Sequence, residues 1–195
     1  MLLGITGGIA TGKSTVARFL HERANLTAFD ADACVHELLA TDHEVISAIR
    51  LEFSLPEAPI DRAVLRQIVF LDAEARRRLE SILHPVVRAK WQGLADDCRA
   101  NGRCLLADVP LLFETGAAPA FDATIVVAAS PQVQQQRLVS RGLEQEMIDA
   151  MLASQWPIRQ KIGLANHVIW NDGSLAELER QCALLLEALF PTRHE

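Results

Sequence analysis

Short runs of consecutive apolar residues alternate along the chain with longer segments of helical periodicity. Five such runs predict buried strands, at residues 2–5, 26–29, 103–109, 123–129 and 167–170. Between them, apolar residues recur at three- and four-residue spacing, which is typical of amphipathic helices. Uniformly apolar strands that alternate with helices predict a parallel five-stranded sheet with helices on both faces, an α/β fold.

The segment between the second and third predicted strands departs from this alternation because its pattern is helical throughout. It runs from residue 33 to residue 102, with apolar stripes at residues 45–53 and 64–69. This length exceeds an ordinary crossover and therefore predicts an inserted helical subdomain. We expect Pro85 to interrupt the helical pattern of residues 72–100, because proline has no backbone N–H.

The stretch between the fourth and fifth strands is also longer than one crossover helix requires. Ser130 and Pro131 are an N-cap and first residue for a helix over residues 131–141. We expect the following residues, about 142–156, to form a mobile helical lid. After the fifth strand, Ser174 and Glu177 predict a capping box at the start of the last helix.

Length and charge limit the classes of function that remain. At 195 residues the chain is too short for two typical independent domains. We therefore expect one core, residues 1–32 and 103–195, with the insertion 33–102. The net charge of −6 argues against broad binding to nucleic acid or to an anionic membrane. No apolar run could span a bilayer and no signal peptide is evident, so we expect a cytoplasmic protein.

The residues after the first strand carry the clearest chemical signal. "GGIATGKS" fits the phosphate-binding loop (P-loop) pattern G-x-x-x-x-G-K-[ST], with Gly7, Gly12, Lys13 and Ser14 at the fixed positions. Glycines let backbone N–H groups approach phosphate oxygens, and the following helix N-terminus favours an anion. We expect Lys13 to reach the β- and γ-phosphates and Ser14 to coordinate Mg²⁺.

Carboxylates follow two other predicted strands, and the ends of parallel strands meet at one edge of a sheet. Phosphoryl transfer needs metal, positioning and a group that accepts the acceptor's hydroxyl proton. We expect Asp32 to be that base; if Asp32 is instead a helix N-cap, Asp30 becomes the candidate. Asp108 ends the run "CLLAD" and is expected either to hold Mg²⁺, usually through water, or to make a local structural hydrogen bond.

Basic residues outside the loop have a functional and a structural interpretation. Arg137 and Arg141 lie one helical turn apart just before the lid, where arginines can neutralise charge on a transferring phosphoryl group, although such a pair is often merely solvated. His84, before Pro85, is either a ligand contact or a structural hydrogen-bonding residue. The insertion also holds a basic cluster, most of it expected to be exposed: Arg62, Arg66, Arg76, Arg77, Arg78, Arg88 and Lys90.

Six segments of the chain together resemble the dephospho-CoA kinase family. They are "GITGGIATGKSTVA", "FDADACVHELL", "LESILHPVV", "ADVPLLFETG", "QQQRLVSRG" and "LANHVIWNDGSLAELERQ", and they occur in the family's order over nearly the whole chain. The resemblance implies a P-loop kinase core. It also implies Mg²⁺-dependent transfer of the ATP γ-phosphoryl group to the ribose 3′-hydroxyl of dephospho-CoA, the last step of coenzyme A biosynthesis.

The resemblance also implies roles for individual residues. Asp32 is similar to the acidic residue that activates the 3′-hydroxyl, and Arg141 to a lid arginine that faces the ATP phosphates; with Lys13 they are the expected catalytic residues. The insertion resembles the family's CoA-binding domain. The expected ATP-binding residues are Gly8, Ile9, Ala10, Thr11, Gly12, Lys13, Ser14, Thr15, Asn171 and Gly173; the expected acceptor-binding residues are Asp32, His84, Pro110 and Leu111; the expected metal ligands are Ser14 and Asp108.

The chain departs from the family's pattern at a few positions. Ala10 stands where many members have a glycine, and its methyl group would strain the loop if φ is positive. Trp170 stands where an acidic residue is common. The lid segment "AMLASQ" lacks an arginine found in some members, so we assign no catalytic role to that helix.

We expect the protein to be a monomer or a weak homo-oligomer. Two alternatives to this function remain open. The nearest is another small P-loop kinase that acts on a nucleotide or metabolite hydroxyl. A nucleotide-dependent switch or assembly factor is less compatible with the chain. The chain lacks N-K-x-D, with which a GTPase recognises guanine, and L-S-G-G-Q, which is typical of ABC-type ATPases.

Overall fold

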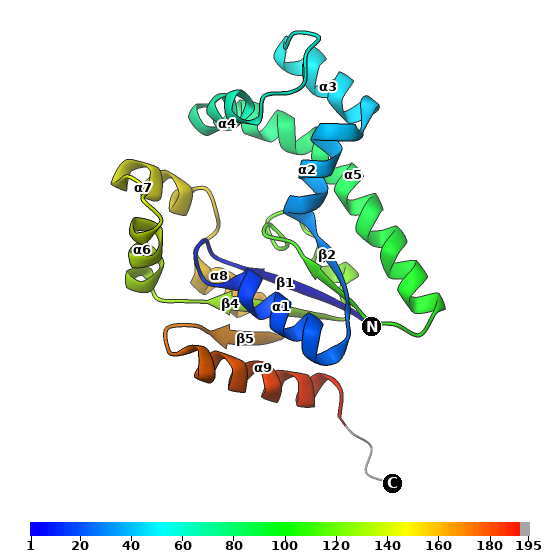
Figure 1. Ribbon diagram of the computed structural model, residues 1–195, viewed down its shortest axis with the longest axis vertical. Helices are drawn as coiled ribbons and strands as arrows, with labels where there is room; N and C mark the ends of the chain where they lie inside the picture. The colour runs from blue at the N-terminus through cyan, green and yellow to red at the C-terminus, as the bar shows by residue number, and fades with distance from the viewer. Residues whose placement is uncertain (192–195) are drawn as a thin grey trace. The chain divides into compact units, whose positions relative to one another are not determined.

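A five-stranded sheet forms the centre of the fold in the computed structural model, which describes residues 1–191 apart from the side chains of Arg66, Phe70 and Leu71. The strand order is β2-β3-β1-β4-β5 (Figure 1). Strand β1 pairs in parallel with β3 and β4, and β4 pairs in parallel with β5. The predicted parallel sheet is confirmed. The strands are β1 (Leu2–Gly7), β2 (Thr27–Asp30), β3 (Leu105–Asp108), β4 (Ala123–Ala128) and β5 (His167–Trp170).

Helices cover both faces of the sheet, as the apolar strands require. On one face, α1 (Lys13–Ala24) and α9 (Leu175–Leu189) pack against each other and over the strands. Their apolar residues join Leu3 and Ile5 of β1 in one buried cluster. On the other face, a Cβ on Gly4 would lie 2.5 Å from Leu112 Cδ1, so the connection between β3 and β4 packs directly on the sheet backbone.

The connections after β3 and β4 contain the remaining helices of this part of the chain. They are the 3₁₀ turn η1 (Ala118–Ala120), α6 (Pro131–Ser140), α7 (Gln145–Ala153) and α8 (Ile158–Leu164). The side-chain oxygen of Ser130 accepts from the Val133 N–H, and Ser174 with Glu177 forms the predicted capping box. Helix α8 has only seven residues and was not predicted from the pattern.

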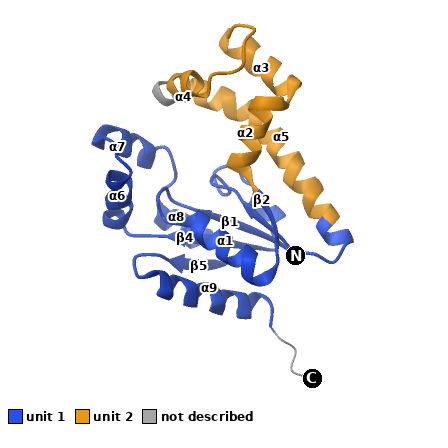
Figure 2. Cartoon of the chain, in the orientation of Figure 1, with its two compact units in different colours: residues 1–29, 98–195 blue, residues 30–97 orange. Residues whose placement is uncertain are grey.

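The chain divides into two compact units, coloured separately in Figure 2. Unit 1 comprises residues 1–29 and 98–195, and unit 2 comprises residues 30–97. Unit 2 contains α2 (Ala31–Thr41), α3 (His43–Phe53), α4 (Arg62–Leu71) and most of α5 (Ala73–Ala100). These limits lie within five residues of the predicted insertion; its role in acceptor binding stays a prediction.

The expected interruption at Pro85 is wrong, because α5 continues through it from Ala73 to Ala100. A proline inside a helix costs one hydrogen bond and some strain. The tertiary structure compensates through one apolar stripe that extends on both sides of the proline. Leu83, Val87, Trp91 and Ala95 are spaced four residues apart and are all buried. Helices in proteins owe most of their stability to such packing.

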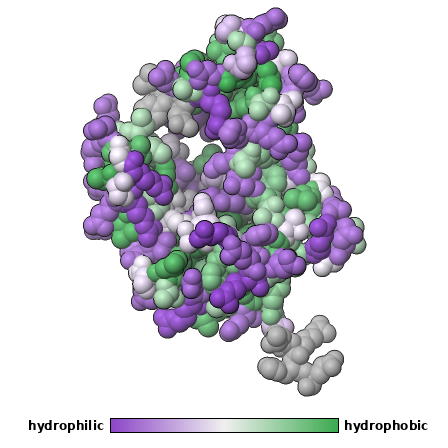
Figure 3. All heavy atoms as spheres, viewed as in Figure 1, coloured by the Kyte–Doolittle hydropathy of each residue, from purple (hydrophilic) through white to green (hydrophobic). Residues whose placement is uncertain are grey.

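Hydrophilic residues predominate on the face drawn in Figure 3, and hydrophobic residues form small separate groups there. The large apolar residues that remain exposed come from many different elements. Among residues 1–191, no helix combines the length and apolar character that crossing a bilayer would require.

Candidate nucleotide-binding site

The P-loop connects β1 to α1, and its glycines stand where a side chain would collide. A Cβ on Gly7 would lie 2.5 Å from the carbonyl oxygen of Val127. Gly12 has a φ of 89°, and a Cβ there would lie 2.2 Å from Asn171 Nδ2. The sequence motif therefore reflects close packing of the loop against β4 and against the end of β5.

Ala10 adopts the positive φ that its methyl group makes unfavourable. Its φ is 57°, in the left-handed region. This conformation costs a non-glycine residue roughly 1–2 kcal/mol. The methyl group is buried in a small apolar cluster with Leu138 of α6 and Ile148 of α7. The departure from glycine therefore introduces strain and also connects the loop to the lid helix.

Three side chains hold the outward-facing carbonyl groups of the loop. The Ile9 carbonyl accepts from Gln134 Nε2 at 2.6 Å, and the Ala10 carbonyl from Arg137 Nη1 at 3.1 Å. Asn171 Nδ2 donates to the Thr11 carbonyl at 2.8 Å. Gln134 and Arg137 come from α6, and Asn171 from the turn after β5.

Because a trans peptide is planar, its N–H and C=O point in opposite directions. The N–H groups of Ala10 and Gly12 therefore face away from Gln134 and Asn171, toward the concave side of the loop. The Thr11 hydroxyl closes the loop by donating to the Gly8 carbonyl at 2.9 Å. The loop is thus held in an anion-binding arrangement by the protein alone.

The sequence had suggested a different grouping for these residues. Arg137 and Arg141, for which the sequence leaves a functional and a solvated role open, have different surroundings in the structure. Arg137 donates to the carbonyls of Ala10 and Asn171, whereas Arg141 is exposed at the end of α6. Gln134 received no role from the sequence, although its spacing of three residues from Arg137 places both on one helical face.

Lys13 forms an ion pair with Asp108 at the carboxyl end of β3. Strands β1 and β3 are neighbours, and Ile5 is in register with Asp108, so the carboxylate lies beside the residues that follow β1. Both side chains are largely buried. A lysine held by a carboxylate at this point is correctly placed to exchange that partner for a phosphate group.

Ser14 and Asp108 supply the kind of ligands that magnesium takes. Ser14 lies in the first turn of α1 with an exposed side chain, and Asp108 offers carboxylate oxygens. Among residues 1–191, no group of three His, Cys, Asp or Glu side chains could hold a metal. Magnesium is usually held by one or two carboxylates together with water and substrate phosphates, so the residues present fit that ion.

Asp30 and Asp32 take different positions at the start of α2. Asp30 is the N-cap, and its Oδ1 accepts from the Ala33 N–H at 3.0 Å. Asp32 lies inside the first turn of the helix. Asp30 would have become the candidate base only if Asp32 had been the N-cap, and the N-cap is Asp30. Asp32 as the base stays a prediction.

The other expected ligand contacts stay predictions as well. Asn171 is buried and bound to the P-loop, while Gly173 lies in the exposed turn that follows. The Pro110 carbonyl accepts from the Thr6 hydroxyl at 2.8 Å, and Leu111 is half-buried. His84 is half-buried in α5. Burial lowers its pKa, against the opposing effect of Glu80, so its ring favours the neutral form.

Three arginines of the predicted basic cluster have partners within unit 2, and the side chain of Arg66 lies outside the described residues. Arg77 pairs with Glu74 at 2.5 Å, and Arg78 with Glu52 at 2.8 Å. Arg62 contacts the ring nitrogens of His36, 2.9 Å from Nε2. This last pair lies at the edge of a pocket.

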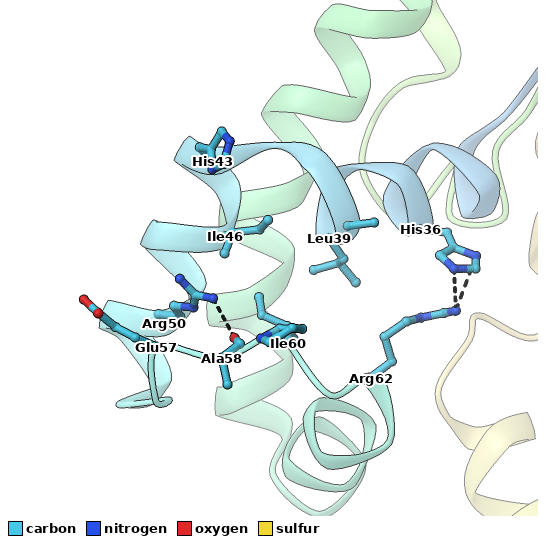
Figure 4. Close-up of a pocket in the computed structure, with 11 residues that line it drawn as sticks. His36, Leu39, His43, Ile46, Arg50, Glu57, Ala58, Ile60 and Arg62 are labelled. Carbon is cyan, nitrogen blue, oxygen red and sulfur yellow. Dashed lines mark hydrogen bonds between the residues drawn. The ribbon is translucent and has the colours of Figure 1, made fainter.

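Figure 4 shows this pocket, which has a volume of about 480 Å³ and lies between α2, α3 and the segment that leads into α4. Leu39, Ile46 and Ile60 provide apolar walls. Arg50 donates from Nη2 to the Ala58 carbonyl at 2.5 Å, and its Nε is buried without a hydrogen-bond partner. The pocket therefore combines apolar surface with cationic groups.

One further charged pair of unit 1 was not predicted from the sequence. Lys161 of α8 is completely buried and pairs with Glu114 at 2.7 Å. Glu114 lies within the quoted motif "ADVPLLFETG", but nothing in the pattern of α8 distinguishes Lys161 from an exposed lysine.

Known proteins resemble this chain over almost its whole length. A sequence model of the dephospho-CoA kinase family matches residues 1–177. The dephospho-CoA kinase of Rhodopseudomonas palustris strain HaA2 is 38% identical over 192 residues, covering 96% of this chain and 95% of that protein.

Two solved structures share the fold. TT1252 from Thermus thermophilus superposes with a TM-score of 0.80 and 32% identity, covering 97% of both chains. The dephospho-CoA kinase from Campylobacter jejuni gives a TM-score of 0.63 and 27% identity, covering 96% of both chains. The fold is therefore shared with a dephospho-CoA kinase of known structure.

Proposed function

The chain belongs to the dephospho-CoA kinase family, and from that premise we propose how its residues carry out the ATP-dependent phosphorylation of dephospho-CoA. The chain is thus a transferase of coenzyme A biosynthesis. The observation that carries the mechanism is the P-loop, whose carbonyls are held outward while Lys13 pairs with Asp108 beside it. The acceptor atom in this proposal is the ribose 3′-hydroxyl oxygen.

The loop binds the phosphates of ATP. Backbone N–H groups on its concave side donate to the phosphate oxygens, and the N-terminus of α1 adds a favourable dipole. Lys13 leaves Asp108 and donates to the β- and γ-phosphates. Asp108 and the Ser14 hydroxyl would hold Mg²⁺, directly or through water. Magnesium, when bound, neutralises charge on the β- and γ-phosphates.

The transfer itself needs a proton acceptor and compensation of charge. The 3′-hydroxyl oxygen bonds to the γ-phosphorus while the bond from that phosphorus to the β,γ-bridging oxygen breaks, which releases ADP. Asp32 takes the hydroxyl proton as the new bond forms. Arg141 offsets the negative charge on the transferring group. The exposed position of Arg141 at the start of the lid supports this role.

Unit 2 binds the remainder of the acceptor in this proposal. Dephospho-CoA carries a pyrophosphate and a long uncharged pantetheine arm. The pocket of Figure 4 offers apolar walls from Leu39, Ile46 and Ile60, with Arg62 and His36 at its edge. The apolar part suits the arm, and Arg62 suits the pyrophosphate.

Release of ADP by the purified protein with Mg-ATP tests the function. Dephospho-CoA, AMP, adenosine and shikimate are compared as acceptors. We expect rapid turnover with dephospho-CoA alone, and a product phosphorylated at the 3′ position by phosphorus NMR. Turnover with another acceptor in the absence of turnover with dephospho-CoA would contradict the proposal in favour of a different small P-loop kinase.

A further inference from the structure

A fully buried lysine lies next to the P-loop, and no step of the proposed reaction uses it. Lys161 has an exposed fraction of 0%. Its ammonium group donates to the carbonyl oxygens of Gly7 at 3.3 Å and Pro110 at 3.1 Å, and to Glu114 Oε1 at 2.7 Å. An ammonium group has three N–H donors. All three are therefore engaged, one with the end of β1 and two with the segment that follows β3.

Stability alone does not account for this pair. Removing an ammonium and a carboxylate from water is costly, and apolar side chains of similar volume are often as stabilising or more so. A leucine or methionine could fill the position in α8. The reason for a charge at this place must then lie in what Lys161 and Glu114 hold.

The groups held are parts of the site itself. Gly7 is the last residue of β1 and the first of the P-loop motif. Pro110 follows two residues after Asp108, where acceptor contacts are expected. Glu114 Oε1 also accepts from the backbone N–H of Trp156 at 3.3 Å, at the end of the lid segment. The pair thus joins the loop, the segment after β3 and the end of the lid, all within unit 1.

The bond to Gly7 has a direct consequence for phosphate binding. Because the peptide between Gly7 and Gly8 is planar and trans, a carbonyl turned toward Lys161 directs the Gly8 N–H the opposite way. Gln134, Arg137 and Asn171 act in the same manner on the carbonyls of Ile9, Ala10 and Thr11, while the Gly8 carbonyl between them accepts from the Thr11 hydroxyl. Lys161 completes this series at the first peptide of the loop.

We propose that Lys161 is a positioning residue for ATP, which orients the first peptide of the P-loop, while Glu114 holds its ammonium group and ties the end of the lid to it. This inference rests on the proposed function, because it assumes that the loop binds phosphates. Neither residue touches the reacting atoms. Removing the pair should weaken ATP binding more than it changes acceptor binding.

The double variant Lys161→Met/Glu114→Gln provides the test. Lys161→Met alone would leave Glu114 buried and unpaired, and so would confuse unfolding with loss of function. The double variant removes both charges and should keep a melting temperature near that of the wild type. We expect its Kd for ATP, measured by calorimetry without acceptor, to rise about tenfold, as for the loss of one hydrogen bond from a charged donor.

Two further readouts separate positioning from a merely structural effect. The KM for ATP should rise while the KM for dephospho-CoA stays within about twofold. Amide exchange at Gly8 should become faster, whereas exchange in the centre of β4 should not change. Gln160→Met is the matched control, because it introduces the same apolar side chain at an exposed position of the same helix and should leave both quantities unaltered.

A folded double variant with wild-type ATP affinity and wild-type Gly8 exchange would overturn the proposal. If the double variant does not fold, Glu114→Gln carries the test. Its amide oxygen still accepts from Lys161, so the variant should fold, but a neutral amide holds the ammonium group less strongly than a carboxylate and should loosen its hold on the Gly7 carbonyl. Wild-type ATP affinity in that variant, with unaltered exchange at Gly8 and Trp156, would overturn the proposal equally. The two proposals fail in different experiments. The role of Lys161 is tested by ATP binding in the variants without acceptor, whereas the proposed function fails if the wild-type protein does not phosphorylate dephospho-CoA.

Discussion

Asp32 carries the chemical role that most needs a direct test at the level of single residues. The N-cap of α2 is Asp30, so Asp32 is available for a role other than capping. A carboxylate that accepts the hydroxyl proton contributes a factor of about 10²–10⁴ to a rate. Its isosteric amide cannot accept that proton.

We predict that Asp32→Asn lowers kcat by at least about 100-fold while ATP binding stays near the wild-type level. Single-turnover ADP formation and calorimetry with ATP measure the two effects separately. Asp30→Asn is the control, because an asparagine still caps the helix. An Asp32→Asn enzyme with nearly wild-type turnover would remove Asp32 as the base.

The methyl group of Ala10 changes the free energy of unfolding through three effects, one unfavourable and two favourable. Its left-handed φ of 57° costs roughly 1–2 kcal/mol relative to glycine. Its buried methyl group contributes about 0.8 kcal/mol through contact with Leu138 and Ile148. Glycine would also increase the entropy of the unfolded chain, by roughly 0.5–1 kcal/mol.

We therefore predict that Ala10→Gly changes the free energy of unfolding by less than about 1 kcal/mol, because these terms nearly cancel. Chemical denaturation in urea measures this change. A loss of more than about 2 kcal/mol would show that packing of the methyl group on the lid outweighs the strain at φ.

At the scale of elements, α7 packs on the P-loop through a small apolar cluster centred on Ile148. Ile148 is fully buried and clusters with Ala10 and Leu138, while its neighbour Met147 is exposed. Ile148 is the buried residue of the lid helix, Leu152 packs beside it partly buried, and their cluster includes Ala10 of the P-loop. Docking of α7 should therefore influence nucleotide binding.

We predict that Ile148→Ala releases α7, because truncating a buried isoleucine costs about 2–5 kcal/mol of packing. Amide exchange over residues 145–153 should become faster, and the KM for ATP should rise several-fold. Hydrogen exchange by mass spectrometry and steady-state kinetics measure these effects. Met147→Ala, on the exposed side of the same helix, should change neither; equal effects of the two variants would refute this role of Ile148.

At the scale of the whole molecule, the two compact units should bind different substrates. The P-loop and its supporting side chains belong to unit 1, whereas the pocket with Arg62 belongs to unit 2. The proposed function therefore predicts that substitutions in the two units affect different Michaelis constants.

We predict that Arg62→Met raises the KM for dephospho-CoA about tenfold through loss of a charge-assisted contact, with the KM for ATP unchanged. Asn171→Ala should do the reverse, because it releases the Thr11 carbonyl behind the P-loop. Initial rates with each substrate varied in turn distinguish the two. Arg77→Met is the control in unit 2, since Arg77 pairs on the surface with Glu74. A rise in the KM for ATP with Arg62→Met would contradict the assignment.

The pH dependence of stability is a second property of the whole fold. Burial lowers the pKa of His84 in the folded protein. Below the unfolded value of about 6.5 the unfolded chain therefore binds more protons than the folded one. The contribution of His84 to stability is present above that pH and is lost as the pH falls through the folded pKa.

We predict that His84→Gln makes the melting temperature fall less between pH 7.5 and pH 5 than it does in the wild type. Thermal unfolding in buffers of constant ionic strength measures the difference, with the exposed His43→Gln as control. An identical fall in wild type and His84→Gln would show that His84 does not contribute to acid sensitivity.

Local pattern was sufficient to predict much of the architecture. The central strands β1, β3 and β4 are buried along their whole length because both faces of the sheet are covered there, and their apolar runs are visible in the sequence. The P-loop was equally evident, since its glycines and lysine have fixed spacing. The capping box at Ser174 depends only on residues three apart. Each of these features is decided by neighbours along the chain.

Long-range packing decided the features that the pattern missed. Pro85 did not end α5, because a buried stripe on both sides of it holds the helix together. Ala10 has a positive φ that no local rule fixes.

The supporting side chains are the clearest case of what only the tertiary structure decided. Gln134, Asn171 and Lys161 reach the P-loop from positions more than 120 residues away in the chain. The sequence by itself determined that a nucleotide is bound through its phosphates and which family of kinases the chain resembles. The folded structure alone decided how that loop is held open for them, because hydrogen bonds between distant residues leave no periodic trace in the sequence.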